Sequence, residues 1–354
     1  MTTISAALIS WFERNKRDLP WRNDRTAWKT LLSEIMLQQT RVDQALPYFE
    51  KFMLRFPTVL DFAKADQDEI LLLWEGLGYY SRARNLHKTT QLIVEQFDGE
   101  IPDNYESLLL IKGIGPYTAA AVSSLVFNES RAVVDGNVIR VISRLYGIDE
   151  DVKTSAVKKR IQEIVDSLID STKPGLFNES LMELGATICK PKNPLCSECP
   201  IQHECVAFSQ ARTEYLPYKA KKAKVPQHRI GIGVILNQLG EVLIAKRPDD
   251  KMLGGLWEFP GGKQEKGEDI ETTIHREFEE EIGIKIKLIK PYSPIKHAYS
   301  HFKISLEAWN GTWISGEPKA KESSEIRWIP IHDLDKYAFP KANRKLIEQI
   351  MKDF

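Results

Sequence analysis

The stretch Leu-Ile-Lys-Gly-Ile-Gly-Pro-Tyr-Thr-Ala-Ala-Ala at residues 110–121 has the pattern of two helices joined by a tight hairpin. Gly113 and Gly115 lack a Cβ atom, so the chain can turn sharply and another backbone can approach closely. Pro116 stands where the second helix would begin, and its missing N–H is harmless there. Exposed hairpin amides and a helix N-terminus together form an anion site that suits a DNA phosphate. Taken alone, an ordinary turn between helices is the simpler interpretation.

Length and composition limit the number of domains and the classes of partner that the chain can have. The 354 residues suggest two domains, and a hydrophobic content of 42% is enough for real cores. Lys and Arg (49) balance Asp and Glu (49), so a DNA-binding face would have to be local. The N-terminus lacks the order of a signal peptide, and no apolar run approaches membrane-spanning length. We expect a cytoplasmic monomer that does not bind membranes.

Residues 1–211 predict a helical domain, because apolar residues recur at a spacing near 3.6 between Pro and Gly breakers. The helical segments are Ile4–Phe12, Leu31–Leu37, Ile70–Trp74, Leu86–Phe97, Val157–Ile169 and Phe177–Ile188. Residues 212–228 are predicted to form an exposed linker. The span from Arg212 to Arg229 contains six Lys or Arg residues and one acidic residue. This basic run suits a solvated tether or a strap along a phosphate backbone.

Residues 229–354 predict a second domain that mixes strands with helices, which suggests an α/β sandwich. The expected elements are a hairpin of Ile230–Leu236 and Glu241–Arg247, a helix over Ile270–Glu281, and strands over His301–Trp309 and Glu325–Ile329.

The four cysteines of the chain fall within seventeen residues, as Cys189-x6-Cys196-x2-Cys199-x5-Cys205. Four thiolates so close in sequence predict one metal site with four ligands. Structural zinc favours two short clips separated by a longer loop, whereas here one short clip has a longer arm on each side. The spacing suits a 4Fe–4S cluster better. Zinc remains an alternative, and disulfides would need an oxidising compartment.

Eighteen residues after Tyr117, Asp135 precedes a glycine and an apolar periodic helix, which first of all indicates an N-cap. The order of hairpin, aspartate and four cysteines resembles the endonuclease III superfamily of base-excision DNA glycosylases, over roughly residues 1–210. Three stretches, Leu19–Arg22, Leu32–Thr40 and Gly76–Asn85, resemble the adenine glycosylase (MutY) branch. The resemblance implies an all-α helix–hairpin–helix glycosylase domain with an iron–sulfur loop at 189–205, followed by an α/β Nudix-like domain.

The same resemblance implies that the chain removes adenine paired with 8-oxoguanine or guanine in duplex DNA. Adenine leaves poorly unless it is protonated. Glu34 lies in an apolar helical segment, where burial would keep it protonated as a general acid; an exposed or arginine-paired glutamate is the alternative. Asp135 would stabilise the positive charge left on the sugar, as carboxylates do in glycoside hydrolysis. By resemblance, Tyr117 and Asn137 support the base and Asp135.

The resemblance also assigns an adenine pocket and a mode of attack. Arg22 and Glu179 would line the pocket. Bifunctional relatives carry a lysine two residues after the second hairpin glycine, but this chain has Tyr117 there, and Lys112 precedes the hairpin. An amine nucleophile is therefore missing where lyase chemistry needs it. This predicts a monofunctional glycosylase; a bifunctional glycosylase and lyase is the disfavoured alternative.

A base inside the duplex must be flipped out before it can be cleaved. Gln39 and Tyr79 match family positions that wedge into the base stack, with Leu77 nearby. Core packing is the alternative for Tyr79 and Tyr80, and we expect one of the two to be buried. The other expected DNA contacts are Thr40, Gly113 and Gly115. The cluster is expected to hold the 196–205 loop against DNA rather than to cleave the bond.

Residues 262–284 contain a complete Nudix box, Gly-x5-Glu-x7-Arg-Glu-Phe-x-Glu-Glu-x-Gly-Ile. Glu277, Glu280 and Glu281 would share a helix face. They would repel one another unless a divalent cation such as magnesium binds them or a basic group neutralises them. In the family this domain resembles MutT and reads 8-oxoguanine, and its box is commonly degenerate. Because the box is intact here, a nucleotide pyrophosphohydrolase is the second candidate activity.

Tyr299, Ser300 and His301 match the family's Phe-Ser-His loop, with tyrosine in place of phenylalanine. A hydroxyl and an imidazole can hydrogen-bond the edge of an oxidised guanine, and the aromatic ring can shape the loop. The alternative is an ordinary strand start.

Overall fold

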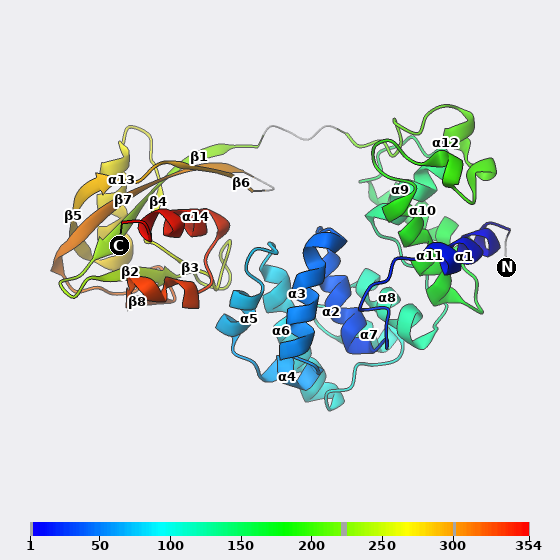
Figure 1. Cartoon of the computed structure of the whole chain (residues 1–354), viewed down its shortest axis with the longest axis horizontal. Helices are drawn as coiled ribbons and strands as arrows, with labels where there is room; N and C mark the ends of the chain where they lie inside the picture. The colour runs from blue at the N-terminus through cyan, green and yellow to red at the C-terminus, as the bar shows by residue number, and fades with distance from the viewer. Residues whose placement is uncertain (1–2, 221–224, 300–301, 354) are drawn as a thin grey trace. The chain divides into compact units, whose positions relative to one another are not determined.

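The computed structural model describes residues 3–220, 225–299 and 302–353 (Figure 1). It divides into two compact units, Met1–Lys64 with Asn85–Lys222, and Ala65–Arg84 with Ala223–Phe354. The short segment 65–84 comes early in the sequence, yet it belongs to the unit that contains the C-terminal sheet.

The first unit consists of helices and loops in its described residues, which confirms the predicted helical fold. The helices are α1 (Thr3–Asn15), α2 (Ala27–Leu37), α3 (Val42–Arg55), α4 (Val59–Lys64), α6 (Ser81–Phe97, which begins in the second unit), α7 (Tyr105–Leu110), α8 (Pro116–Phe127), α9 (Gly136–Leu145), α10 (Ser155–Leu168), α11 (Pro174–Thr187) and α12 (Val206–Ser209). Helices α7 and α8 form the predicted hairpin pair around residues 111–115.

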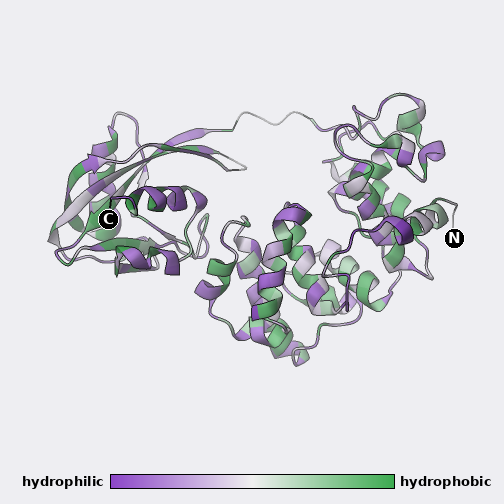
Figure 2. Ribbon diagram, viewed as in Figure 1, coloured by the Kyte–Doolittle hydropathy of each residue, from purple (hydrophilic) through white to green (hydrophobic). Residues whose placement is uncertain are grey.

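Local sequence explains where several of these helices begin. The side chains of Thr26, Asn104 and Thr154 accept backbone N–H bonds at the first turns of α2, α7 and α10. Helices α1, α9, α10 and α11 then share one core, in which Leu8 and Leu181 are fully buried. Figure 2 shows hydrophobic and hydrophilic residues alternating along these helices.

The second unit contains α5 (Gln67–Leu73), one mixed sheet and two flanking helices. The strands are β1 (Gln227–Leu236), β2 (Glu241–Lys246), β3 (Trp257–Glu258), β4 (Gly261–Lys263), β5 (Ile284–Pro291), β6 (Ile295–Ala298), β7 (Lys303–Gly316) and β8 (Glu325–Pro330), and the helices are α13 (Ile270–Glu277) and α14 (Lys341–Ile350). The strand order is β3-β2-β1-β7-β5, with β4 on β1, β6 on β7 and β8 on β2.

Successive residues of β1 point to opposite faces of the sheet and enter two different cores. Val234 packs in the core that includes Leu346 of α14, whereas Ile235 packs in the core that includes Ile274 of α13. The predicted hairpin of β1 and β2 is confirmed as an antiparallel pair. The domain is therefore the expected α/β sandwich.

The structure corrects the predicted helix over Ile270–Glu281. The α-helix ends at Glu277, and Phe278–Ile282 form a wider π-helical turn. Gly283 adopts a left-handed φ of +80°, and its N–H reaches back five residues to the carbonyl of Phe278 at 2.9 Å. Of the predicted strand His301–Trp309, Phe302 lies outside any strand and Lys303–Trp309 lie in β7, which runs on to Gly316 because it pairs with β1, β5 and β6. Nowhere in the described ranges does a helix combine the length and apolar character needed to span a bilayer.

Candidate active site

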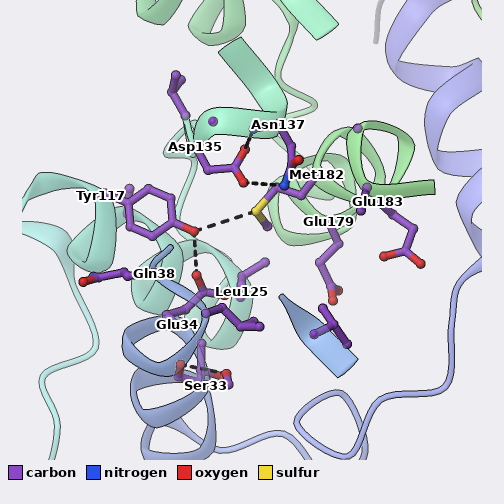
Figure 3. A pocket seen from close by; sticks show the side chains of 18 of the residues that line it. Ser33, Glu34, Gln38, Tyr117, Leu125, Asp135, Asn137, Glu179, Met182 and Glu183 are labelled. Carbon is purple, nitrogen blue, oxygen red and sulfur yellow. Dashed lines mark hydrogen bonds between the residues drawn. The ribbon is translucent and has the colours of Figure 1, made fainter. Parts of the chain in front are cut away.

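A cavity of about 1510 Å³ opens in the first unit between α2, α8, α9 and α11. Glu34 enters it from α2, Tyr117 from α8 and Glu179 from α11, and Asp135 lies at the start of α9 (Figure 3). Asn137 and Arg22 also line this cavity. The structure thus brings the expected catalytic and adenine-pocket residues into one site.

Glu34 is buried, with 7% of the residue exposed. Burial raises the pKa of its carboxyl to about 7, helped by the nearby charges of Asp135 and Glu179 and opposed by a hydrogen bond from Tyr117. A large fraction of Glu34 is therefore protonated at neutral pH. The exposed alternative for this glutamate is excluded.

The Tyr117 hydroxyl donates a hydrogen bond to Oε2 of Glu34 over 2.6 Å. Burial and the charge of Glu34 raise the pKa of Tyr117 well above its ordinary value, so this side chain stays neutral. Because Oε2 accepts from the phenol, the acidic proton of Glu34 belongs on the other oxygen, Oε1. A carboxylic acid arranged in this way can donate to a base in the cavity.

Asp135 serves both as a helix cap and as a group in the cavity. Its Oδ1 accepts from the backbone N–H groups of Asn137 (2.8 Å) and Val138 (2.7 Å), and its Oδ2 accepts from the Asn137 side chain (2.8 Å). Burial raises the pKa of Asp135, and these hydrogen bonds oppose that effect. A Cβ atom at Gly185 of α11 would lie 2.6 Å from the Asn137 Cβ, so only glycine permits this approach of α11 to α9.

Helix α9 also connects the cavity to the cysteine loop. Arg140 donates to the Asn137 side-chain oxygen (2.8 Å) and to the backbone carbonyl of Cys189 (2.7 Å). One turn further, Arg144 donates to the carbonyl of Lys190 (2.7 Å) and contacts the Cys189 Sγ at 3.3 Å. A continuous hydrogen-bonded path therefore runs from Asp135 to the first cysteine.

Arginines from the loop before α2 meet two glutamates of α11. Arg22 donates to Glu179 and to Glu183, each at 2.9 Å. Arg25 also donates to Glu179, at 2.7 Å. Arg22 and Glu179 were predicted here from the sequence, whereas Arg25 and Glu183 were not. The available signal was the four-residue spacing of the two glutamates, which puts them on one helix face.

Glu183 is the most strongly paired carboxylate of this network. Arg17 binds both of its oxygens, at 2.7 and 2.9 Å. Burial alone would raise the pKa of Glu183, but the hydrogen bonds from Arg17 and Arg22 hold it at about 2. Glu183 is therefore an anion throughout the neutral range and fixes both arginines.

The backbone has unusual conformations at the hairpin and at the mouth of the cavity. Gly113 has a φ of +103°, and a Cβ there would lie 2.1 Å from the Thr89 hydroxyl oxygen, so the turn requires glycine. Around Gly115 the space is open. Gln39 is exposed at the cavity mouth in the left-handed region, with a φ of +60°, and Thr40 follows it. Strained exposed residues of this kind are common at binding sites.

The other expected wedge residues lie in the second unit. Tyr79 is 40% exposed and has a φ of +49°. Tyr80 is only 6% exposed, which confirms that one of the two tyrosines packs in a core. Leu77 is buried, with 3% exposed, so its side chain does not share the surface of Tyr79 here.

Residues 32–167 match the model of HhH-GPD superfamily base excision DNA repair proteins. The adenine DNA glycosylase of Homo sapiens is 31% identical over 403 residues, covering 98% of this chain and 73% of that protein. The adenine DNA glycosylase of Buchnera aphidicola from Acyrthosiphon pisum is 31% identical, covering 99% and 98%. The chain belongs to the adenine DNA glycosylase family.

Membership of the adenine DNA glycosylase family makes the chain a base-excision DNA glycosylase. Among solved structures, a thermostable thymine-DNA glycosylase aligns with a TM-score of 0.52 and 28% identity, covering 58% of this chain and 95% of that one. Residues 189–205 match the iron–sulfur binding domain of endonuclease III, and residues 231–349 match the Nudix domain.

The cysteine loop of this adenine DNA glycosylase family member therefore binds an iron–sulfur cluster. All four cysteines are free, half-buried thiols. Burial, together with the charges of Cys189, Cys205 and Cys196, raises the pKa of the Cys199 thiol to about 11. Buried thiolates need metal charge nearby, and sulfur donors suit iron–sulfur clusters. The donor chemistry of the four cysteines thus fits the group, although their described positions do not form a metal-holding arrangement.

The Nudix box has a basic partner for part of its acidic trio. Arg276 donates to Glu268 (2.7 Å), Glu277 (2.9 Å) and Glu280 (3.0 Å). Burial raises the pKa of Glu281 to about 8, with help from the charge of Glu258. Within the described ranges, no group of three or more His, Cys, Asp or Glu side chains is arranged to hold a metal ion. The divalent cation stays a prediction.

Only part of the expected lesion-reading loop can be described. The Tyr299 ring stacks on Phe302 at 4.9 Å and meets the His297 ring edge-on at 4.6 Å, which gives the loop an aromatic base. Ser300 and His301 lie outside the described residues.

Proposed function

We propose that this chain removes adenine paired with 8-oxoguanine or guanine in duplex DNA, by monofunctional hydrolysis of the N-glycosidic bond. The main support is the grouping of a half-protonated Glu34, its Tyr117 donor and the Asp135 carboxylate in one cavity. The names of the similar proteins agree with adenine as the base.

In the proposed first step, Glu34 donates its proton to a ring nitrogen of a flipped adenine. Its pKa of about 7 matches a general acid that works near neutral pH. Arg22 and its partners Glu179 and Glu183 hold one another in place. They would offer fixed hydrogen-bond donors and acceptors to the side of the base that faces away from Glu34. Glu179 and Arg22 would line this pocket.

In the proposed second step, the bond between adenine and the sugar breaks and leaves positive charge on the sugar. Asp135 would stabilise this oxocarbenium-like state or bond briefly to the anomeric carbon. Three hydrogen bonds from Asn137 and Val138 favour its ionised form and fix its orientation. Water then completes hydrolysis and leaves an abasic site.

A lyase step has no support at the hairpin. Tyr117 occupies the position of the lyase lysine, and its hydroxyl is engaged with Glu34. We therefore propose that the DNA strand stays intact after base release.

The remaining parts of the chain have proposed supporting roles. Gln39, Thr40, Tyr79, Gly113 and Gly115 would contact DNA. A 4Fe–4S cluster on the four cysteines would hold its loop against the duplex.

The domain limits are proposed as 1–211, a 212–228 linker and 229–354. Tyr299, Ser300 and His301 would read 8-oxoguanine. A divalent cation at Glu277, Glu280 and Glu281 would compete with Arg276, which already binds two of the three carboxylates.

One incubation tests the proposal. Purified protein is mixed with duplexes that carry adenine opposite 8-oxoguanine, guanine or thymine, and each sample is then treated with alkali. We expect alkali-dependent cleavage at adenine opposite 8-oxoguanine first and guanine second. Cleavage at none of the three would reject the proposed substrate. Magnesium-dependent pyrophosphate release from 8-oxo-dGTP, lost in Glu281→Gln, would instead support the hydrolase as a second activity.

A further inference from the structure

Glu75 joins the end of α5 to the C-terminal domain within the second unit. Its Oε1 accepts from the backbone N–H of Phe339 at 2.7 Å and from Arg344 Nε at 2.6 Å. Both side chains of the ion pair are mostly covered, with 20% of Glu75 and 23% of Arg344 exposed. A charged pair shielded in this way is stronger than one in open solvent.

Arg344 is itself fixed by the fold of the C-terminal domain. Its guanidinium donates to the carbonyls of Leu334 (3.2 Å) and Tyr337 and lies 5.3 Å from the Phe339 ring centre. Phe339 is fully buried and stacks on Phe259 at 5.6 Å. Glu75 therefore pairs with an arginine that the surrounding fold holds in place.

Two further contacts bracket the same segment. At the start of α5, Gln67 donates to the Asp249 carboxylate at 3.1 Å. After the turn, Arg84 donates to the backbone carbonyls of Asp249 (3.1 Å) and Gly254. Residues 67–84 are thus attached to the C-terminal domain at two points before the turn 76–80 and at one point after it.

The turn 76–80 carries Tyr79 and depends on its own internal contacts. The Trp74 indole and Arg82 both donate to the Gly78 carbonyl, at 3.0 and 3.1 Å. The Arg82 guanidinium lies 5.3 Å from the Trp74 ring and 5.5 Å from the Tyr79 ring. Glu75 follows Trp74 in the chain. A shift of Glu75 would therefore move Trp74 and, through the contacts of Trp74 with Gly78 and Arg82, would also move Tyr79.

We propose that Glu75 and Arg344 are a positioning pair, through which the C-terminal domain sets the wedge residue Tyr79. The inference rests on the proposed function. Because the wedge turn and the lesion-reading domain belong to one compact unit, contacts to 8-oxoguanine help to place Tyr79 in the base stack. The pair thus makes base flipping depend on the identity of the opposite base.

The test uses the full-length protein and three measurements. Single-turnover adenine release is measured opposite 8-oxoguanine and opposite guanine. The fluorescence of 2-aminopurine beside the target adenine reports unstacking, and thermal melting reports the fold. The variants are Glu75→Gln, Arg344→Met and their double. Glu75→Gln keeps an acceptor for the Phe339 N–H, so it is the gentler change. Arg229→Met is the control, because it breaks a bidentate pair with Glu307 away from residues 65–84.

We expect Glu75→Gln to slow release opposite 8-oxoguanine by about tenfold, a typical size for coupling between sites. Release opposite guanine should change little, the 2-aminopurine signal should fall, and the double variant should be no slower than the slower single variant. Equal losses on both substrates, additive losses, or the same loss in Arg229→Met would overturn the inference. A wild type that releases no adenine would reject the proposed function instead, and the 2-aminopurine signal would then decide the positioning pair by itself.

Discussion

The hydroxyl of Tyr117 and Oε2 of Glu34 form a 2.6 Å hydrogen bond across the candidate active site. This bond opposes the effect of burial on the Glu34 carboxyl and leaves its pKa at about 7. It also orders the acid, since one oxygen accepts from the phenol while the other carries the proton. The same tyrosine that stands where lyase relatives would carry a lysine thus tunes the proposed general acid.

Tyr117→Phe should therefore change the pH dependence of adenine release. Without the hydrogen bond, the pKa of Glu34 rises above its wild-type value of about 7. An acid must be protonated to act, so the rate falls as pH rises through this pKa. In the variant the fall should move to higher pH, while the plateau drops by up to about 100-fold because the acid is less well oriented. Single-turnover rates from pH 5 to 9 (roughly the range around this pKa) measure both effects. A fall that moves to lower pH would contradict this role.

Glu183→Gln should lower stability at neutral pH. The free energy of unfolding should drop by about 2 kcal/mol, less than the ~3–5 kcal/mol of fully buried pairs, because Arg17 is partly exposed. The wild-type pKa of about 2 lies below the ordinary value of 4.5, so this stability is present above about pH 4.5 and is lost towards pH 2. Melting curves of the two proteins should therefore converge as pH falls through that window. Glu150→Gln, in an exposed pair with Arg160, is the control and should leave melting almost unchanged. A gap that widens at low pH would disprove the pairing.

Abasic sites should accumulate intact until alkali or heat is added. The reason is the tyrosine at the lyase position, which has no amine to form a Schiff base. Borohydride is added during turnover to trap any covalent adduct. An adduct that forms as fast as adenine is released would overturn the monofunctional assignment, whereas a slow adduct through another lysine would not.

The purified protein should be brown and contain iron rather than zinc. Cys199→Ser should reduce solubility or DNA affinity more than the rate of bond cleavage within the bound complex, because the loop is expected to face DNA. Ser197→Ala, in the same loop without a ligand change, is the matched control. Stoichiometric zinc without iron in anaerobically prepared protein would contradict the assignment.

Much of the site could be predicted because its residues stand in local motifs. Asp135 caps α9 through residues two and three positions ahead, so a glycine and an apolar helix after it are sufficient signals. Glu183 could not be found in this way, since its partner Arg17 is 166 residues away. Pairing at such a distance depends on how α11 packs, and single-sequence periodicity carries no information about it.

In the fold too, some features are determined by neighbouring residues and others by contacts between residues far apart in the sequence. Helix periods and the β1–β2 hairpin follow from nearby residues, whereas the sequence did not show which of Tyr79 and Tyr80 is buried. The membership of residues 65–84 in the second unit does not follow from nearby residues, because it depends on contacts such as Glu75 with Arg344 across 269 positions. The π-helical turn after α13 closes with a backbone bond from Gly283 to Phe278, which the apolar pattern does not reveal.

Glu34→Gln tests the central claim most directly. The variant keeps the size of the side chain and an oxygen for Tyr117, but it cannot donate an acid proton. Single-turnover release of adenine opposite 8-oxoguanine is measured at pH 7 (about the pKa of the wild-type acid), together with the affinity for the same duplex. We predict normal binding and release slowed by about 10²–10⁴-fold. Near-wild-type release by Glu34→Gln would contradict the account.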